Sequence, residues 1–138
     1  MPSSSAPGNG KAIILVVERD PHVRELELHF LEEAGYAVEF ADDGVVALEK
    51  VRESVPDILV TEILVPGLDG LALCRKLKAD PRTRDVAVLV FSILSASDRA
   101  REAGADAFLR KPLAEHTLVG TVQALLEARS ERIRRAGQ

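Results

Sequence analysis

Charged side chains directly follow three short apolar runs of this chain, where they could do chemistry together. The run at residues 12–17 is followed by Glu18, Arg19 and Asp20. The run at residues 58–61 is followed by Glu62, and the run at residues 106–110 is followed by Lys111. The carboxyl ends of parallel strands meet at one edge of a sheet, which is where such folds place their sites. Carboxylates gathered there supply the oxygen ligands that a divalent cation prefers.

The chain as a whole alternates between two kinds of segment. Five short apolar runs have the composition of strands buried on both faces of a parallel sheet, at residues 12–17, 36–40, 57–62, 86–91 and 106–110. Helical spacing follows each run, and the five predicted helices begin near Asp20, Asp43, Asp69, Ser97 and Lys111. This alternation predicts an α/β fold with helices on both faces of the sheet, although periodicity leaves the strand order open.

The first two helices show which of their faces we expect to be buried. In the helix after Asp20, the expected inward-facing residues are Val23, Leu26, Phe30, Leu31 and Ala34. In the helix after Asp43, they are Val45, Val46, Leu48 and Val51.

Length and composition limit the class of protein. The 138 residues and 46% hydrophobic content predict one globular domain, and the net charge of −4 gives no reason to expect nucleic acid. A single cysteine suits a reducing compartment, and no apolar run is long enough for a membrane span, so we expect a cytoplasmic protein. Residues 1–10 are expected to form a disordered leader, 11–128 the domain and 129–138 a C-terminal helix extension.

Four segments with recognisable sequences follow one another along the chain. They are the acidic turn that begins at Glu18, then ADDGVVALEKV, PDILVTEILVPGLDG and GADAFLRKPL. Together they resemble the receiver domain of bacterial two-component response regulators, including the chemotaxis receivers, over about residues 11–128. The resemblance implies a flavodoxin-like three-layer α/β/α sandwich with strand order 2-1-3-4-5. It also implies a role in phosphorelay signal transduction.

The resemblance assigns roles to the charged residues. Receivers typically carry two adjacent acids after the first strand, which hold Mg²⁺ together with a phosphoacceptor aspartate. Here Glu18 matches the first acid, Arg19 replaces the second and is followed by Asp20, and Glu62 replaces the aspartate. Lys111 matches the lysine that bridges the phosphoacceptor carboxylate.

Three further residues have counterparts in the family. Ser92 matches the switch hydroxyl that turns inward to bind the phosphoryl group, and Phe108 matches the aromatic residue whose rotamer follows it. Lys111 precedes Pro112, and the resemblance implies that the bond between them is cis.

Glu62 and Arg19 together predict a site that has lost its phosphorylation chemistry. The longer glutamate would place its carboxylate about 1 Å too far out for in-line transfer, and a guanidinium cannot ligate a cation. We therefore expect no catalytic residue, no metal and no cofactor, with Glu62 paired to Arg19, Lys111 or both. An active-like arrangement would turn Ser92 Oγ toward Glu62 and Phe108 inward.

Two alternatives stay open at this point. Arg19 could point to solvent while Asp20 takes its place near the site. The domain could also be a Mg²⁺-dependent phosphoreceiver that a histidine kinase phosphorylates, with Asp20 or Glu18 serving the metal.

The side of the domain that the family uses to report to partners is also altered. Only eleven residues separate Ser92 from Gly104, about three fewer than is usual in receivers and close to one helical turn. The basic end of the last helix, residues 131–135, is either a solvated helix end or a protruding helix that mediates dimerisation or leads to another domain. The expected partners are signalling proteins, namely a histidine kinase, an output protein or a second copy of this chain.

Overall fold

Five parallel strands form a single sheet in the computed structural model, which describes residues 10–112 and 114–137. The strands are β1 (Ile13–Val17), β2 (Ala37–Ala41), β3 (Ile58–Thr61), β4 (Ala87–Ser92) and β5 (Ala107–Arg110). Their order, β2-β1-β3-β4-β5, confirms the predicted flavodoxin-like topology. The leader predicted for residues 1–10 lies, except for Gly10, outside the described residues.

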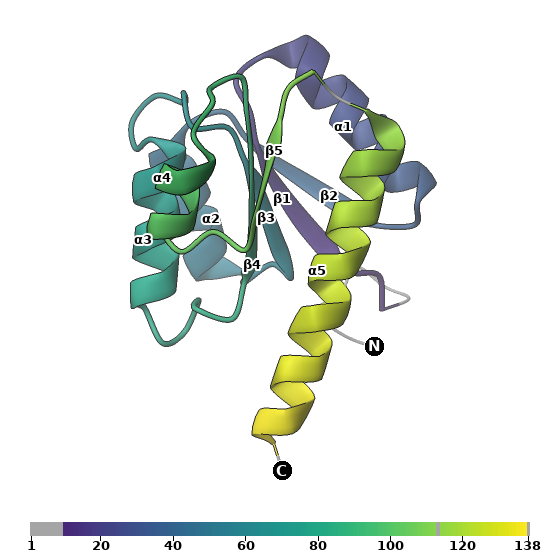
Figure 1. The fold of residues 1–138 in the computed structure, drawn as a ribbon, viewed down its shortest axis with the longest axis vertical. Coiled ribbons are helices and arrows are strands. Elements are labelled where there is room, and N and C mark those ends of the chain that lie inside the picture. Colours follow the sequence, from purple (N-terminus) through teal and green to yellow (C-terminus); the bar gives the residue numbers. More distant parts are fainter. Residues whose placement is uncertain (1–9, 113, 138) are drawn as a thin grey trace.

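A helix follows each strand and covers one face of the sheet. The helices are α1 (Pro21–Glu33), α2 (Gly44–Glu53), α3 (Gly70–Ala79), α4 (Ser97–Glu102) and α5 (Glu115–Ala136). Helices α1 and α5 lie on one face, and α2, α3 and α4 lie on the other (Figure 1). Within the described ranges, no helix combines the length and apolar character that a membrane span needs.

The two faces of the sheet bury separate aliphatic cores. Leu15 and Val17 of β1 pack with α2 and α3, whereas Ile14 and Val16 pack with α1 and α5. Successive side chains of a strand point to opposite faces, so a strand buried on both sides must be apolar throughout. This explains the continuous apolar runs of the sequence.

Aspartates fix the loops at the carboxyl ends of the first three strands. Asp20, Asp43 and Asp69 are the N-caps of α1, α2 and α3, and each side chain accepts a hydrogen bond from a backbone N–H of its helix. Such caps satisfy amide groups that the first helical turn leaves without partners. The site edge of the sheet is therefore held by caps as well as by strands.

The predicted buried face of α1 is wrong by about one position. Leu26 is 47% exposed, whereas Glu27 and Leu31 are the buried residues of this helix. Glu27 lies four residues after Val23 and four before Leu31, so it shares their face of the helix. An acidic side chain thus occupies a core position.

The predicted face of α2 is also partly wrong, because Val45 and Val46 are exposed. Gly44 and Ala47 are buried instead, together with the expected Val51. A Cβ atom at position 44 would overlap the backbone carbonyl of Leu68. The helix therefore turns its glycine toward the loop after β3, and its two valines face outward.

Helix α5 runs past the edge of the sheet at its C-terminal end (Figure 1). Near this end, Arg129 connects α5 to the loops before two strands. Its Nε donates to the carbonyl oxygen of Asp85 at 2.8 Å, and its Nη1 lies 3.1 Å from Asp57 Oδ1. Asp57 in turn accepts a hydrogen bond from Ile13 N at 2.8 Å. Arg129 therefore joins α5 to three strand starts, and the helix projects beyond that point.

Candidate functional site

Glu62 follows directly after β3, and its carboxylate turns back into the fold. The residue is 4% exposed. Its Oε1 accepts hydrogen bonds from the backbone N–H groups of Ile63 at 2.6 Å and Leu64 at 3.3 Å, and Oε2 accepts one from Ile93 N at 3.2 Å. Backbone amides from the loops after β3 and β4 therefore converge on this one carboxylate.

Two side chains complete the set of donors. The hydroxyl of Ser92 donates to Glu62 Oε1, and Lys111 Nζ lies 2.9 Å from Oε2. Burial alone would raise the pKa of Glu62, but the hydrogen bonds from Ser92 and Lys111 and the lysine charge outweigh it. The pKa consequently lies below its ordinary value. Glu62 is a stably ionised carboxylate.

Position 70, at the end of the loop after Glu62, leaves no space for any side chain and therefore requires glycine. A Cβ atom there would overlap the backbone carbonyl oxygen of Glu62, and Gly70 N donates to the carbonyl of Ile63 at 3.0 Å. The close approach of this helix start to the strand end requires glycine. Gly70 thereby helps to fix the backbone from which Glu62 extends.

Lys111 is the centre of the charge cluster. Its Nζ lies 2.7 Å from Glu18 Oε1 and 2.9 Å from Glu62 Oε2, and 5.5 Å from the centroid of the Phe91 ring. Burial opposes its charge, but the two carboxylates prevail and hold its pKa above the ordinary value. The Lys111–Pro112 bond is cis, as the resemblance implied.

Glu18 is the second buried acid of the cluster. It is 2% exposed; Oε1 contacts Lys111, and Oε2 accepts a hydrogen bond from the backbone N–H of Asp20 at 3.1 Å. Both of its oxygens are therefore used within the protein. The carboxylate therefore stabilises the turn between β1 and α1 and also holds the ammonium of Lys111 in place.

Of the two partners expected for Glu62, the structure places Lys111 against it and not Arg19. Arg19 is exposed, and no ion pair within residues 10–112 and 114–137 joins it to Glu62. The chain turns sharply after β1, so Glu18 points inward while the next side chain points to solvent. Asp20 is exposed too, with its carboxylate capping α1 through His22 N at 2.9 Å. Among the described residues, it is Lys111 that supplies the positive charge at Glu62.

The donor set of this site does not fit a resident Mg²⁺. A magnesium ion needs oxygen ligands with free lone pairs, but Glu18 and Glu62 already share the ammonium of Lys111, and the residue between Glu18 and Asp20 is an arginine, which supplies no oxygen ligand. Among the residues that the structure describes, no group of three or more His, Cys, Asp or Glu side chains is arranged to hold a metal.

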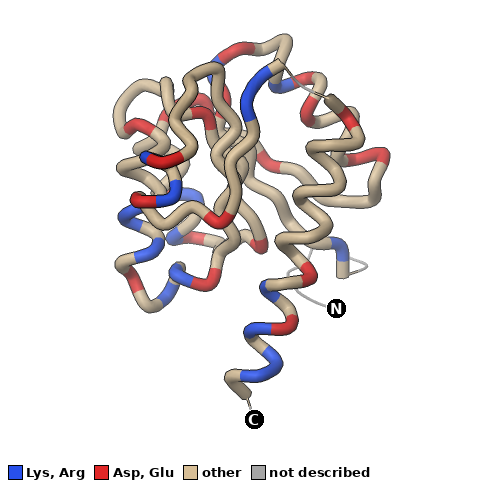
Figure 2. The backbone as a smooth tube through the Cα atoms, in the orientation of Figure 1, with Lys and Arg blue, Asp and Glu red and all other residues tan. Residues whose placement is uncertain are grey.

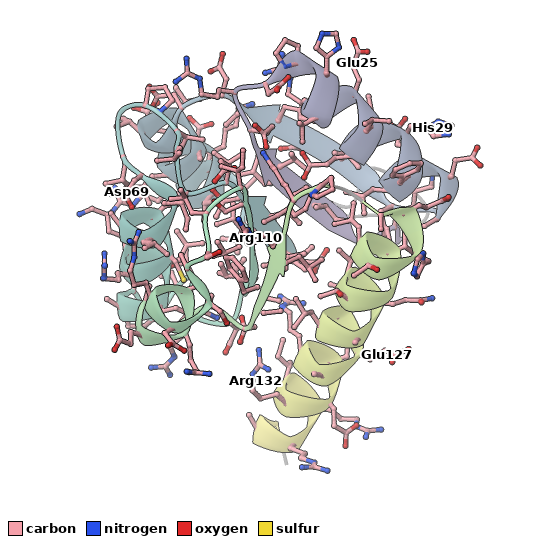
Figure 3. All side chains as sticks on the ribbon, turned by 45° about the horizontal axis from the view of Figure 1, so that its top comes forward. Glu25, His29, Asp69, Arg110, Glu127 and Arg132 are labelled. Atoms are coloured by element: carbon pink, nitrogen blue, oxygen red, sulfur yellow. The ribbon has the colours of Figure 1, made fainter. Side chains whose placement is uncertain are left out.

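Ser92 has the orientation that the active-like arrangement requires. It is fully buried; its hydroxyl donates to Glu62 and accepts a hydrogen bond from Leu94 N at 3.1 Å. Phe108 is half-buried, packs against the core beneath α3 and α4, and lines a hollow beside α4. Arg110 Nε, at the end of β5 (Figure 3), donates to the carbonyl of Ile93 at 3.2 Å. The loop after β4 is thus held from both sides.

Sequence reasoning missed Glu27, a third acid near the cluster. It is 1% exposed, and its Oε1 has no hydrogen-bond partner in the part of the chain that the structure describes. Burial and the negative charge of Glu18 raise its pKa to about 8, so it is protonated at neutral pH. The signal that could have revealed it is its spacing of four residues from both Val23 and Leu31.

Comparison with known proteins agrees with this fold. The family model of the response regulator receiver domain matches residues 14–123. The response regulator MprA of Mycobacterium leprae (strain TN) is 43% identical over 116 residues, which cover 82% of this chain and 50% of that protein.

Two solved structures are similar along nearly their whole length. The signal receiver domain of a signal transduction histidine kinase from Syntrophus aciditrophicus is 38% identical with a TM-score of 0.80, covering 85% of this chain and 91% of that one. The chemotaxis response regulator CheY4 of Vibrio cholerae is 25% identical with a TM-score of 0.78, covering 83% and 98%.

The chain belongs to the family of response regulator receiver domains, the signal-receiving modules of two-component systems. It spans about half the length of the curated relatives that it matches.

Proposed function

We propose that this receiver domain works in two-component signalling as a phosphorylation-independent protein-interaction module in the bacterial cytoplasm. The observation that supports this most strongly is the set of donors around Glu62. Backbone amides from two loops, the Ser92 hydroxyl and the Lys111 ammonium all converge on its carboxylate. In an ordinary receiver, a lysine and a switch hydroxyl of this kind serve an incoming phosphoryl group.

Phosphorylation of Glu62 would meet two obstacles. Both carboxylate oxygens already accept hydrogen bonds, so a nucleophilic oxygen becomes available only when several donors are lost. Transfer of a phosphoryl group also depends on a cation that neutralises the developing charge. Glu18 and Glu62 are both paired with Lys111, and Arg19 offers no oxygen ligand at the position of the second acid, so the site lacks the ligand set that would hold such a cation.

The same contacts favour one conformation of the loops after β3 and β4. Glu62 holds Ser92 turned inward and holds Ile93 N by a hydrogen bond, as a phosphoryl group would. We infer that Glu62 keeps these loops in an active-like arrangement, from which the domain recognises its partner by contact alone. The partner is a signalling protein, such as a histidine kinase or an output protein, and the domain itself is not an enzyme.

Incubation with Mg²⁺ and acetyl phosphate, followed by intact-mass spectrometry, tests the proposal. We expect the mass of the protein to stay unchanged, while a receiver with an aspartate phosphoacceptor, treated in parallel, gains a phosphoryl group. A phosphoryl adduct mapped to Glu62 would overturn the proposal. It would instead support a Mg²⁺-dependent phosphoreceiver in which Glu18 or Asp20 serves the metal.

A further inference from the structure

Two hollows lie along the same side of α5. The first, of about 400 Å³, lies between α1 and the start of α5, where Phe30, Glu33, Val119 and Gly120 are among its lining residues. The second lies beside the projecting part of α5, with Leu126 in its wall. Glu127 and Arg134 in the wall of the second hollow follow Gly120 in the first at intervals of seven residues, so both hollows lie on one side of the helix.

An apolar line runs along α5 between these hollows. Val119, Leu126 and Ile133 recur at intervals of seven residues, which is close to two helical turns and keeps them on one side of the helix. Val119 and Leu126 are half-buried, and Ile133, on the projecting part, is 41% exposed. The fold of one copy covers the start of this line and leaves its end open.

We propose that α5 pairs in an antiparallel manner with the α5 of a second copy, across a two-fold axis at Leu126. Equal spacing on either side of Leu126 then places Ile133 of each copy against Val119 of the other. Each Ile133 lies about 10 Å along the helix from the axis. The second copy thus covers the open end of the apolar line.

The first hollow has room for this contact at Gly120. A Cβ atom added there would meet no heavy atom within 4 Å, so the helix surface is open at that point. Phe30 and Val119 form apolar walls on either side. A branched side chain such as Ile133 is of the right kind to fill the space above a glycine.

Charge at the two ends of α5 is complementary in the antiparallel arrangement. The first hollow is lined by the acids Glu33 and Glu115. At the other end of the helix, Arg134 and Arg135 share the single carboxylate of Glu131, which leaves a surplus of positive charge. Figure 2 shows basic residues at the free end of α5 and acidic ones along α1. Pairing brings each basic end to an acidic hollow.

The arrangement closes on itself because every contact occurs twice. A two-fold interface uses the same surface of both copies, so it produces a dimer and leaves no open end for further growth. It involves neither Glu62 nor its loops. The dimer therefore stands or falls independently of the proposed phosphorylation-independent function.

Sedimentation velocity of the full 138-residue chain over a range of concentrations tests the proposal. We expect a dimer, and we expect Ile133→Asp to weaken it by about tenfold or more, because the aspartate would be buried in an apolar contact. Gly120→Gln should weaken it comparably, since the new side chain fills the hollow while remaining favourable in the monomer helix. Ala128→Asp, on the opposite and exposed side of α5, is the matched control and should leave dimerisation unchanged.

A charge exchange tests the orientation of the two helices. Glu33→Arg should weaken the dimer, and adding Arg134→Glu to the same chain should restore it. Circular dichroism and thermal unfolding establish that each variant is folded. A chain that stays monomeric at every concentration overturns the proposal. So does a dimer that Ile133→Asp and Gly120→Gln leave intact, or one that Ala128→Asp dissociates, because each result places the contact elsewhere.

Discussion

Lys111 and Glu18 form an ion pair that is almost closed to solvent. Nζ lies 2.7 Å from Oε1, and the two side chains are 15% and 3% exposed. The same ammonium lies 2.9 Å from Glu62, so one positive charge serves two buried carboxylates that follow β1 and β3. The cluster joins three strand ends, and its members are expected to depend strongly on one another.

Removal of the lysine should be costly. Lys111→Met leaves Glu18 and Glu62 buried with no cation, and breaking a buried pair in this way typically costs about 3–5 kcal/mol. The free energy of unfolding, measured by urea denaturation at neutral pH, should fall by that amount. Lys76→Met removes an exposed lysine of α3 and should change it little. Equal urea midpoints for the two variants would contradict the structural role of Lys111.

The low pKa of Glu62 predicts how stability depends on acid pH. A carboxyl whose folded-state pKa is lowered stabilises the fold above its ordinary pKa of 4.5, and this contribution is lost as the pH falls through the lower folded value. Glu62→Gln should remove this part of the acid dependence. It should also lower stability at neutral pH, because an amide cannot accept from all of these donors. Urea midpoints from neutral pH down to about pH 3 measure both effects. Identical acid limbs in the two proteins would refute the assignment.

Glu27 should have the opposite dependence, because its pKa is raised from 4.5 to about 8. The unfolded chain releases this proton at lower pH than the folded one, so stability falls as the pH rises between these two values. The slope for one proton is about 1.4 kcal/mol per pH unit. Glu27→Gln should remove that decline, since the amide never ionises. Unfolding measured across this range gives the slope directly.

Glu25→Gln is the matched control for Glu27, because Glu25 is an exposed acid on the same helix (Figure 3). It should keep the wild-type pH dependence. If Glu27→Gln and Glu25→Gln behave alike, the buried carboxyl does not carry the effect.

Restoring both acids of an ordinary receiver should restore its chemistry. The double variant Arg19→Asp, Glu62→Asp shortens the carboxylate at the acceptor position and replaces a cation with a metal ligand. We expect it to gain a phosphoryl group from acetyl phosphate in Mg²⁺, whereas each single variant gains little. Intact-mass spectrometry with and without Mg²⁺ is the measurement. Efficient phosphorylation of the Glu62→Asp single variant would show that Arg19 is no obstacle.

Much of the fold could be predicted from the sequence because its strands are buried on both faces. Such strands must be apolar throughout, and Asp20, Asp43 and Asp69 mark the helix starts that follow them. The strand order needed the family resemblance, since pairing between strands leaves no periodic signal. The faces of α1 and α2 were harder to predict, because apolar residues at neighbouring positions fit more than one rotation of a helix.

The site was predicted where the family resemblance named a residue and the topology of the sheet fixes its position. Ser92 ends β4 and Lys111 follows β5, so the sheet brings both to Glu62. The direction of Arg19 stayed open in the sequence because it lies in a turn, where side chains no longer alternate as in a strand. Glu27 was missed because α1 is rich in acids, and only tertiary packing distinguishes the buried one from the exposed ones.

The hydrogen-bond donors that surround the Glu62 carboxylate bear on how this domain could be controlled. A receiver with a reactive aspartate reports the ratio of its modified to its unmodified form. On the proposed function, Glu62 stays unmodified and no such ratio exists, so the remaining variables are the number of copies and the affinity of the partner. Output would then follow synthesis, degradation and the affinity of the partner. A dimer adds a concentration threshold to that response, because the fraction of paired chains rises with total protein.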